Sequence, residues 1–443
     1  MFILIRFPHF YNKKEMIWSR YTYQFEKNNR CFLYNSLSNS LAEIPRSLHC
    51  AVKKGMHDGE TDFLDEETFR QLKAMKVLVE NDDDEINKVI YQNSLRRREE
   101  RRLILTINPT LACNFNCPYC FEPDHPNIYM SEEVEDGIVR FVKSRTNAKA
   151  IDVTWFGGEP LLAFDRVKSL SRKLQNLGLA YNGRMITNGY LLSSEVIEEL
   201  PSLSITSLQI TVDGMAALHD SRRCLRSGKP TFERIMKNID ILQTRYPKIG
   251  ISIRMNVDET NKEDFINFYH YVSAKHYPNA QLSLAFVKDL SDCKSCTNIC
   301  NREKQVEFVK HVMQNYGIGD ALLYPISDRY ECSIRNKNSL VIGPEGEVYK
   351  CWNDVGDKRK VVGNINGKVF NEALLLRYLV GADPFMDSQC QECLLLPVCG
   401  GGCPLSRIRN KYEGARDNVC PLYKENMDDL FFIHALEKIS HLQ

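Results

Sequence analysis

The sequence predicts an α/β protein built around a parallel sheet, either an open doubly wound sheet or a (β/α) barrel. From residue 103 onward, short runs rich in β-branched residues alternate about six times with segments of helical period. The chain of 443 residues also exceeds the size at which a single core keeps growing. We therefore expect three domains, which cover residues 1–102, 103–320 and 321–443.

The charge and apolar content are those of an ordinary globular protein. Lys plus Arg total 58 against 57 Asp plus Glu, and 43% of the residues are hydrophobic. No large field of either sign would attract nucleic acid or a membrane surface. The apolar start, residues 1–5, is too short for a signal sequence or a membrane span. We expect a cytoplasmic protein that binds neither nucleic acid nor membranes.

The first domain is expected to be a compact α+β unit. Short strands are expected within residues 21–34, helical stretches at 40–54 and 66–75, and a short strand at 77–79. Residues 81–102 are dense in charge and are expected to form a solvated linker or helix.

The central domain contains the expected strands of the parallel sheet. They are residues 103–108, 151–156, 184–187, 208–212, 249–257 and 281–287. One connecting helix opens at Ser131, where Glu132 and Glu133 suit the first turn, and another ends near Gly178. In such a fold, chemistry takes place at the carboxyl ends of the strands.

Sixteen cysteines in a large chain without a secretion signal indicate metal or redox chemistry rather than disulfides. Cys113, Cys117 and Cys120 follow the first barrel strand with the spacing Cys-x3-Cys-x2-Cys. Three such thiolates can bind three irons of a cubane cluster and leave the fourth iron open to an external ligand. A structural zinc site usually has four protein ligands, and the nearest histidine is His125. The pattern predicts an iron-sulfur cluster with an open iron on these three cysteines.

This loop, with Tyr119 directly before its last cysteine, resembles the radical S-adenosylmethionine (SAM) superfamily. The resemblance implies a partial (β/α)6 barrel in which the amine and carboxylate of S-adenosyl-L-methionine bind the open iron of a [4Fe-4S] cluster. It also implies that an electron from this cluster cleaves the cofactor to a 5′-deoxyadenosyl radical, which abstracts a substrate hydrogen.

The resemblance extends to the ends of three further strands, whose residues are implied to bind the cofactor. The Gly-Gly-Glu-Pro run at 157–160 is similar to the family's element for the methionine amine, where glycines admit close approach and a carboxylate suits an ammonium. The full set of implied cofactor residues is Tyr119, Gly157, Gly158, Glu159, Pro160, Thr187, Asn188, Thr211 and Asp213. Simple turn chemistry is the alternative for Asn188-Gly189 and Asp213-Gly214.

The C-terminal cysteines resemble the auxiliary-cluster domain called SPASM, which follows the barrel in enzymes that modify peptides and proteins. The matching cysteines are Cys332, Cys351, Cys390, Cys393, Cys399, Cys403 and Cys420. The resemblance implies a distal cluster on Cys390, Cys393, Cys399 and Cys420, and a nearer cluster on Cys332, Cys351 and Cys403 without an obvious fourth ligand. Three [4Fe-4S] clusters are thus expected in total. The alternative is one zinc held by Cys390, Cys393, Cys399 and Cys403.

A further group, Cys293, Cys296 and Cys300, follows the sixth strand and is not part of the family pattern. One of these thiols can complete the nearer auxiliary cluster, handle substrate thiols or belong to an additional metal site. The remaining alternative is that they are ordinary loop cysteines.

The resemblance also bears on the substrate. Sulfatase maturases place an aspartate base directly after the cysteine that corresponds to Cys351, whereas this chain has Trp352 there and Asp354 two residues later. Residues 17–80 resemble a reduced form of the winged-helix-like element with which peptide maturases bind a leader peptide by strand addition, although a structural cap on the barrel is the alternative.

We therefore expect a radical maturase that installs a thioether or carbon–carbon crosslink in a ribosomally made peptide. Its expected partners are a precursor peptide with a leader sequence and an electron donor such as flavodoxin or ferredoxin. The competing hypotheses are a sulfatase-type or cofactor-precursor maturase and, outside catalysis, a metal-bound scaffold protein.

Overall fold

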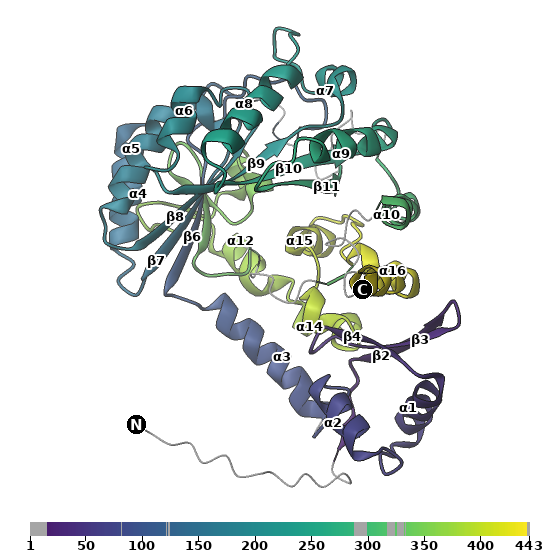
Figure 1. Ribbon diagram of the computed structural model, residues 1–443. Coiled ribbons are helices and arrows are strands. Elements are labelled where there is room, and N and C mark those ends of the chain that lie inside the picture. Colours follow the sequence, from purple (N-terminus) through teal and green to yellow (C-terminus); the bar gives the residue numbers. More distant parts are fainter. Residues whose placement is uncertain are drawn as a thin grey trace, which may run out of the picture.

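The computed structural model of the protein describes residues 16–80, 82–120, 122, 125–287, 299–316, 324–325, 332 and 334–440. A large α/β unit is linked by a long helix to a small N-terminal domain, and the cysteine-rich C-terminal elements lie between these two parts (Figure 1). Within the described ranges, no helix is both long and apolar enough to cross a membrane.

The N-terminal domain is an α+β unit, as the sequence predicts. Strands β2, β3 and β4 form one antiparallel sheet in that order, and β1 pairs with β5. The elements are β1 (Ile17–Trp18), β2 (Thr22–Lys27), β3 (Arg30–Asn35), β4 (Ser40–Ile44), α1 (Arg46–Asp58), α2 (Glu66–Ala74) and β5 (Leu78–Val79).

One expectation for this domain is wrong. The stretch expected to be helical from residue 40 begins as strand β4, because Ser40–Ile44 pair with β3 along their whole length. Helix α1 begins only after Pro45, which has extended backbone angles. A proline lacks an N–H donor and fixes φ, so it is tolerated at the start of a helix but not inside one.

The charged stretch after this domain forms helix α3 (Asp82–Arg97), which runs from the N-terminal domain to the barrel (Figure 1). Both ends of the helix are fixed by buried charge. Glu85 is buried and accepts a hydrogen bond from the Ser19 hydroxyl at 2.6 Å. Arg97 forms an ion pair with Asp383 of the C-terminal segment, with Nη1 and Oδ2 2.5 Å apart.

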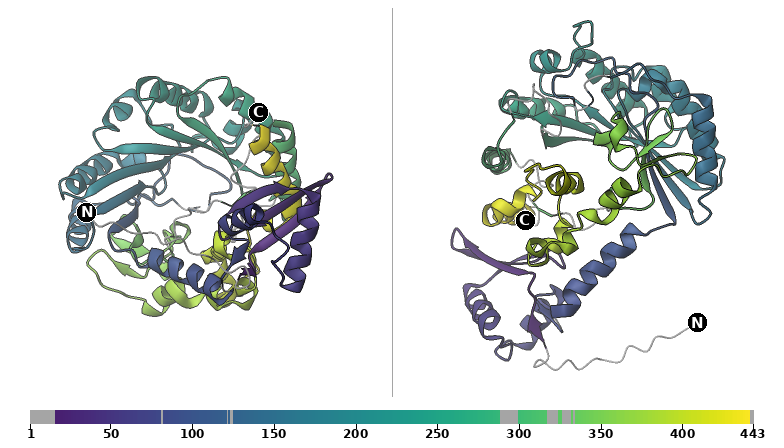
Figure 2. Two further views of the ribbon diagram at one scale, coloured as in Figure 1. Left: turned by 60° about the horizontal axis from the view of Figure 1, so that its bottom comes forward. Right: turned by 180° about the vertical axis from the view of Figure 1, so that it is seen from behind.

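Six parallel strands in sequential order form the central sheet, which confirms the predicted barrel class. The strands are β6 (Arg102–Ile107), β7 (Ala150–Trp155), β8 (Ala180–Thr187), β9 (Ile205–Thr211), β10 (Gly250–Val257) and β11 (Ala280–Phe286). The connecting helices are α4 (Glu132–Lys143), α5 (Phe164–Gln175), α6 (Ser194–Glu199), α7 (Ala216–Arg222), α8 (Phe232–Arg245), α9 (Phe265–Ser273) and α10 (Arg302–Tyr316). The strands form an open arc with helices on its outside (Figure 2).

The sheet continues beyond these six strands into the C-terminal segment. Strand β12 (Ser339–Ile342) is parallel to β6, and β13 (Glu347–Tyr349) and β14 (Gly363–Asn364) follow as antiparallel neighbours. These three strands, which the sequence did not suggest, join the cysteine-rich segment to the barrel edge through backbone hydrogen bonds.

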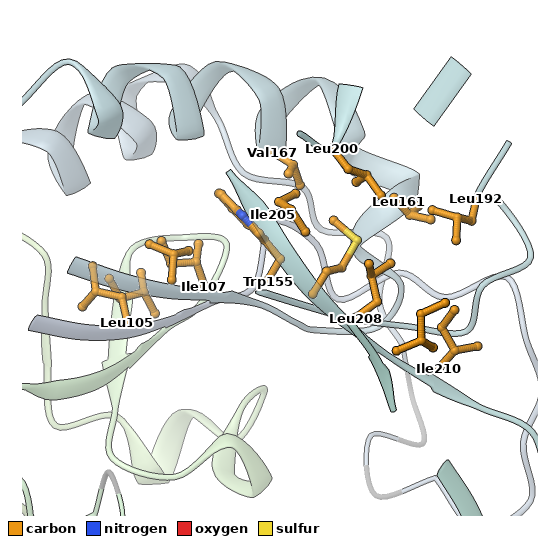
Figure 3. Packing of buried hydrophobic residues seen from close by; sticks show 14 of the residues in the cluster. Leu105, Ile107, Trp155, Leu161, Val167, Leu192, Leu200, Ile205, Leu208 and Ile210 are labelled. Carbon is orange, nitrogen blue, oxygen red and sulfur yellow. The ribbon is translucent and has the colours of Figure 1, made fainter. Parts of the chain in front are cut away.

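The barrel core explains why the strand runs are apolar. Trp155, Leu208 and Ile210 are almost completely buried, and they share one apolar core with Val167 of α5 and with Leu200, which directly follows α6 (Figure 3). Parallel strands covered by helices are buried on the helix side, which selects branched apolar residues. The rigid sheet that results fixes the positions of the loops at its carboxyl ends.

Short helices form most of the C-terminal segment. They are α12 (Glu372–Leu376), α13 (Ser388–Gln391), α14 (Leu396–Cys399), α15 (Pro404–Tyr412) and α16 (Met427–Ser440). The 3-10 turns of the chain are η2 (Pro160–Ala163), η3 (Lys262–Asp264), η4 (Trp352–Asp354), η5 (Lys358–Lys360), η7 (Pro384–Met386) and η8 (Leu422–Glu425), and η6 (Arg377–Gly381) is a π-helical turn.

Helix α16 joins the two ends of the chain. Phe432 meets Phe32 of β3 edge to face, with ring centroids 5.7 Å apart, and Phe431 packs on Tyr34 at 4.7 Å. At the edge of this contact, Lys27 of β2 forms an ion pair of 2.5 Å with Asp429. The N-terminal sheet therefore packs firmly on the C-terminal segment.

Candidate active site and cluster-binding cysteines

The three-cysteine loop leaves the carboxyl end of β6 and is held by backbone contacts with a second segment. Phe115 forms an antiparallel bridge with Leu225. The N–H of Asn116 donates to the Cys224 carbonyl at 3.1 Å, and the N–H of Arg226 donates to the Asn114 carbonyl at 2.9 Å. The loop conformation is therefore fixed by residues that follow helix α7.

The thiols of this loop are shielded from water. Cys113 and Cys117 pack against the barrel core, and burial raises the pKa of Cys113 and of Cys120 to about 12. The backbone N–H of Phe115 points to the Cys113 sulfur at 3.5 Å. A ring nitrogen of His125 lies 3.3 Å from the Cys120 sulfur. Such thiols stay neutral alone and become thiolates when a metal displaces the proton.

The glycines of the Gly-Gly-Glu-Pro run pack against the cysteine loop. A Cβ added at Gly158 would come within 2.2 Å of the Ala112 carbonyl oxygen, and one at Gly157 within 2.4 Å of the Thr110 carbonyl oxygen. The N–H groups of Gly158 and Glu159 donate to these same oxygens at 3.2 and 2.8 Å. Glycine is therefore required because the segments that follow β6 and β7 approach each other closely. The sequence alone did not reveal this reason.

Glu159 joins the ends of β7 and β8. Its carboxylate is completely buried and accepts hydrogen bonds from the Thr187 hydroxyl at 2.6 Å, the Asn188 N–H at 2.7 Å and the Leu161 N–H at 3.0 Å. Burial raises its pKa against the effect of these donors. Pro160 is also buried and begins the turn η2. Three of the sequence-predicted cofactor residues therefore meet here, while their contact with the cofactor itself stays a prediction.

Tyr119 of the cysteine loop is hydrogen-bonded to Asp213, which follows β9. The Tyr119 hydroxyl donates to Asp213, which is completely buried and also accepts from the Asn256 N–H at 3.1 Å. Thr211, the last residue of β9, is buried two positions earlier. The cysteine loop, β9 and β10 thus converge on one carboxylate.

Two arginines and a histidine beside Tyr119 and Asp213 were missed by the sequence reasoning. Arg223 donates to the Tyr119 hydroxyl at 2.8 Å, and Arg222 binds the Asp258 carboxylate at 2.9 Å. The Nδ1 of buried His219 accepts from the Asp213 N–H at 3.1 Å. The only sequence signal was the run from His219 to Arg223, which lies a few residues after the end of the fourth strand.

The charge of Arg223 matches an anionic group on the cysteine loop. Its guanidinium is buried, its Nε has no hydrogen-bond partner, and the Asn114 Nδ2 nearby is also unsatisfied. Although burial opposes the charge, the pKa of Arg223 is raised well above its ordinary value, first through Cys117 and then through Tyr119 and Asp213. Buried cations persist when negative charge compensates them. The residues present therefore fit an iron-sulfur cluster and a carboxylate-bearing cofactor.

The four cysteines assigned to the distal cluster line one cavity. Cys390, Cys393, Cys399 and Cys420 surround it together with Arg407 and Lys424. They come from α13, the turn after it, α14 and the segment before η8. Cys403 is not among the lining residues, which argues against the zinc alternative that pairs it with Cys399. Four converging thiols are the donor set that an iron-sulfur cluster requires.

The nearer group is also brought together. Burial raises the pKa of Cys351 well above its ordinary value, and the neighbouring Asp354, Cys332 and Cys403 add to this rise. Among the residues that the structure describes, no three Cys, His, Asp or Glu side chains converge tightly enough to hold a single metal ion. In a cubane each cysteine binds a different iron, so wider spacing of the sulfurs is what a cluster needs.

The third cysteine group is only partly visible. Cys293 and Cys296 lie outside the described residues. Cys300 is buried, and burial followed by a hydrogen bond to Glu259 raises the pKa of its thiol to about 11. Cys300 therefore lies beside Glu259, which follows the end of β10, and its role stays a prediction.

The position after Cys351 carries an aromatic surface. The Trp352 ring is 46% exposed and lies against Phe156, which directly follows β7, with centroids 5.9 Å apart. Asp354 is turned away from solvent and accepts a hydrogen bond from the Tyr378 hydroxyl at 2.7 Å. Burial raises the pKa of Asp354 to about 6.

Comparison with known proteins identifies the central domain. Residues 107–272 match the model of the radical SAM superfamily. A serine-type anaerobic sulfatase-maturating enzyme of Bacteroides thetaiotaomicron is 27% identical over 361 residues, which cover 70% of this chain and 85% of that protein. The radical SAM cyclopropyl synthase TigE of Paramaledivibacter caminithermalis is 24% identical over 482 residues, which cover 93% and 95% of the two chains.

Two solved structures show the same fold. The enzyme anSMEcpe with bound AdoMet and Cp18Cys peptide aligns with a TM-score of 0.59 at 22% identity and covers 76% of this chain and 98% of its own. SuiB of Streptococcus suis bound to S-adenosylmethionine aligns with a TM-score of 0.54 at 17% identity and covers 92% and 98%. At these identities the likeness establishes the architecture.

Proposed function

This chain belongs to the radical SAM superfamily and is an enzyme that modifies peptides or proteins, and from this premise we propose that it crosslinks side chains of a ribosomally made peptide. The bond formed is a thioether or a carbon–carbon bond. Cys113, Cys117 and Cys120 would hold the catalytic cluster. The bound cluster and S-adenosylmethionine supply a 5′-deoxyadenosyl radical that abstracts a substrate hydrogen.

The observation that carries this proposal is the aromatic residue at position 352. The resemblance places the base of sulfatase maturases directly after the cysteine that corresponds to Cys351, and an indole cannot take up a proton in that role. Trp352 instead packs on Phe156 and exposes part of its ring beside the Gly-Gly-Glu-Pro run. An aromatic wall at the carboxyl ends of the strands suits the positioning of two side chains better than the removal of a proton.

The N-terminal domain supports a peptide substrate with a leader. Strands β2 and β4 are the edges of a three-stranded sheet, and an extended peptide can add to such an edge. The alignment with TigE covers 93% of this chain, whereas that with the sulfatase maturase covers 70%. We assign leader binding to this domain.

The remaining residues have complementary roles. Glu159, Thr187 and Asn188 would hold the amine end of the cofactor, and Tyr119, Thr211 and Asp213 would lie along its other side. Arg223 balances the negative charge of the cysteine loop. The C-terminal cysteines would hold two auxiliary clusters that take the electron released on product formation, and a flavodoxin or ferredoxin would provide the first electron.

The test is a reaction with a candidate precursor peptide, chosen from the short reading frames beside this chain's gene. Enzyme, S-adenosylmethionine, dithionite and peptide are incubated without oxygen, and the product is analysed by mass spectrometry. We expect a loss of two hydrogens, no fragments between the crosslinked residues, and no reaction with an aldehyde-specific hydrazide. A peptide without its leader serves as the control and should react much more slowly. An unmodified peptide in the presence of cofactor cleavage would contradict the proposal.

Sulfatase-type maturation is the second candidate, and Asp354 is the observation that favours it. This buried carboxyl has a pKa of about 6, so it can accept a proton near neutral pH, and the identity to the Bacteroides enzyme is 27%. In this case a sulfatase peptide with a target serine or cysteine should yield a hydrazide-reactive aldehyde. The activity should be lost in Asp354→Asn and retained in Trp352→Phe.

A further inference from the structure

Two cationic side chains stand beside the four thiols of the distal cavity. Arg407 and Lys424 line the same space as Cys390, Cys393, Cys399 and Cys420. The reasoning that follows rests on the proposed function in one respect, because it takes these cysteines as ligands of an iron-sulfur cluster. Four thiolates satisfy such a cluster by themselves, so the cations require another explanation.

Arg407 is held rigidly with one nitrogen on a cysteine. Its Nε donates to the Gly401 carbonyl at 2.5 Å, its Nη1 donates to Asp387 at 2.8 Å, and its Nη2 donates to the Cys390 sulfur at 2.6 Å. The side chain is only 10% exposed. Because the guanidinium is planar, the first two contacts fix the direction of the third.

Lys424 lies beside a different cysteine of the ligand set. Its Nζ lies 3.6 Å from the sulfur of Cys420, the last of the four cysteines, whereas Arg407 contacts the first. The two cations come from separate elements, helix α15 and turn η8. Two different cysteines of the set therefore each have a cation beside them.

We propose that Arg407 and Lys424 are positioning residues that donate hydrogen bonds to the distal cluster's thiolates and raise its reduction potential. On reduction the cluster takes up one electron and gains one negative charge. Nearby cations stabilise the reduced form more than the oxidised form, and hydrogen bonds to the sulfurs act in the same direction.

The surroundings of the cavity strengthen this effect. Cys390 packs with Tyr21, Phe385 and Leu396, so the N-terminal domain excludes water on one side. Cys393 and Cys399 contact the cluster of apolar residues around Phe32. In such a low-dielectric environment, a cation interacts more strongly with the cluster than it would at the same distance on a solvated surface. Both effects raise the reduction potential of the distal cluster, so the cluster accepts an electron more easily.

A redox titration tests the proposal. The Cys113→Ala, Cys117→Ala and Cys120→Ala triple variant is reconstituted without oxygen and should hold about eight irons in its two auxiliary clusters. Its midpoint potentials are measured by dithionite titration with electron paramagnetic resonance. Adding Arg407→Gln should move one potential to a more negative value without loss of iron. Arg407→Lys, which keeps the charge, should move it less.

Matched variants separate tuning from folding. Arg409→Gln removes the same charge from the same helix, but Arg409 faces Asp417 at 3.7 Å and does not line the cavity, so both potentials should stay unchanged. Lys424→Gln should shift the same midpoint potential as Arg407→Gln. If Arg407→Gln loses iron, the potential of Lys424→Gln tests the proposal in its place. Unchanged potentials in Arg407→Gln and Lys424→Gln with full iron would overturn the inference. A parent that holds only about four irons before these changes would instead contradict the distal cluster itself.

Discussion

Several buried charged side chains surround the three-cysteine loop. Their hydrogen bonds and ion pairs indicate which segments each of them holds together. Glu159 ties β7 to β8, and Asp213 ties the cysteine loop to β9 and β10. Arg222 is paired with Asp258, whereas the Nε of Arg223 is left without a partner. Charged groups remain buried only where such interactions offset desolvation. The site is therefore prepared for additional negative charge beside Arg223.

The hydrogen bonds of Glu159 predict the effect of its removal. Glu159→Ala leaves three buried donors without an acceptor, which should lower the free energy of unfolding by about 3 kcal/mol. It should also weaken binding of S-adenosylmethionine, because Thr187 and Asn188 lose their anchor. Thermal unfolding and equilibrium dialysis measure the two effects, with Glu195→Ala, a change at an exposed position of helix α6, as the control. An unchanged melting temperature would contradict this role.

His219 predicts a pH dependence of stability. Burial, followed by Arg223 and Arg222, lowers its pKa well below 6.5, so the folded protein keeps this ring neutral. The unfolded chain binds a proton there below about pH 6.5, so stability is full above that pH and falls as the pH drops. We expect the melting temperature to fall between about pH 7 and 5. His219→Gln should flatten this slope, and an identical slope in the variant would refute the assignment.

Sequence reasoning predicts the site residues whose type and spacing a cluster would require. Cys113, Cys117 and Cys120 are recognisable because cluster ligands require that spacing. Arg223 is not recognisable, because a buried arginine and a surface arginine look alike in a sequence. Arg223 reaches Tyr119 only because the chain after α7 folds back onto the cysteine loop.

At the scale of elements, the parallel strands were predictable because buried strands need continuous apolar runs. Strand β12 was not, because its four residues have no pattern of their own and depend on pairing with β6. Strand β4 was mistaken for a helix start for a related reason, since its partner β3 determines its conformation. Pairing between distant segments is the information that local patterns lack.

The contact between β6 and β7 predicts the effect of one added methyl group. In Gly158→Ala the new Cβ would stand 2.2 Å from the Ala112 carbonyl oxygen, so the cysteine loop must move. We expect the catalytic cluster to be lost, a decrease of about four irons, with the auxiliary clusters retained. Gly250→Ala is the matched control, since its Cβ would meet nothing closer than 3.8 Å. Normal iron content in Gly158→Ala would show that this contact does not shape the loop.

At the scale of the whole molecule, cysteines from three regions of the sequence pack against segments that are distant in the chain. The three-cysteine loop follows the carboxyl end of strand β6. Cys332 and Cys351 of the nearer group stand before β12 and after β13, and Cys390 of the distal group packs against the N-terminal domain. Contacts such as Phe32 with Phe432 connect residues almost a full chain length apart. The N-terminal domain is therefore placed to influence both the substrate peptide and the environment of the distal cysteines.

The central claim is that the barrel loop generates a radical from S-adenosylmethionine, and the most direct test is the formation of 5′-deoxyadenosine. Reconstituted protein with about twelve irons should release this product when dithionite and cofactor are added without oxygen. The Cys113→Ala, Cys117→Ala and Cys120→Ala triple variant should release none while it keeps about eight irons, because it lacks only the cluster of the barrel loop. Cofactor cleavage that persists in this triple variant would contradict the account.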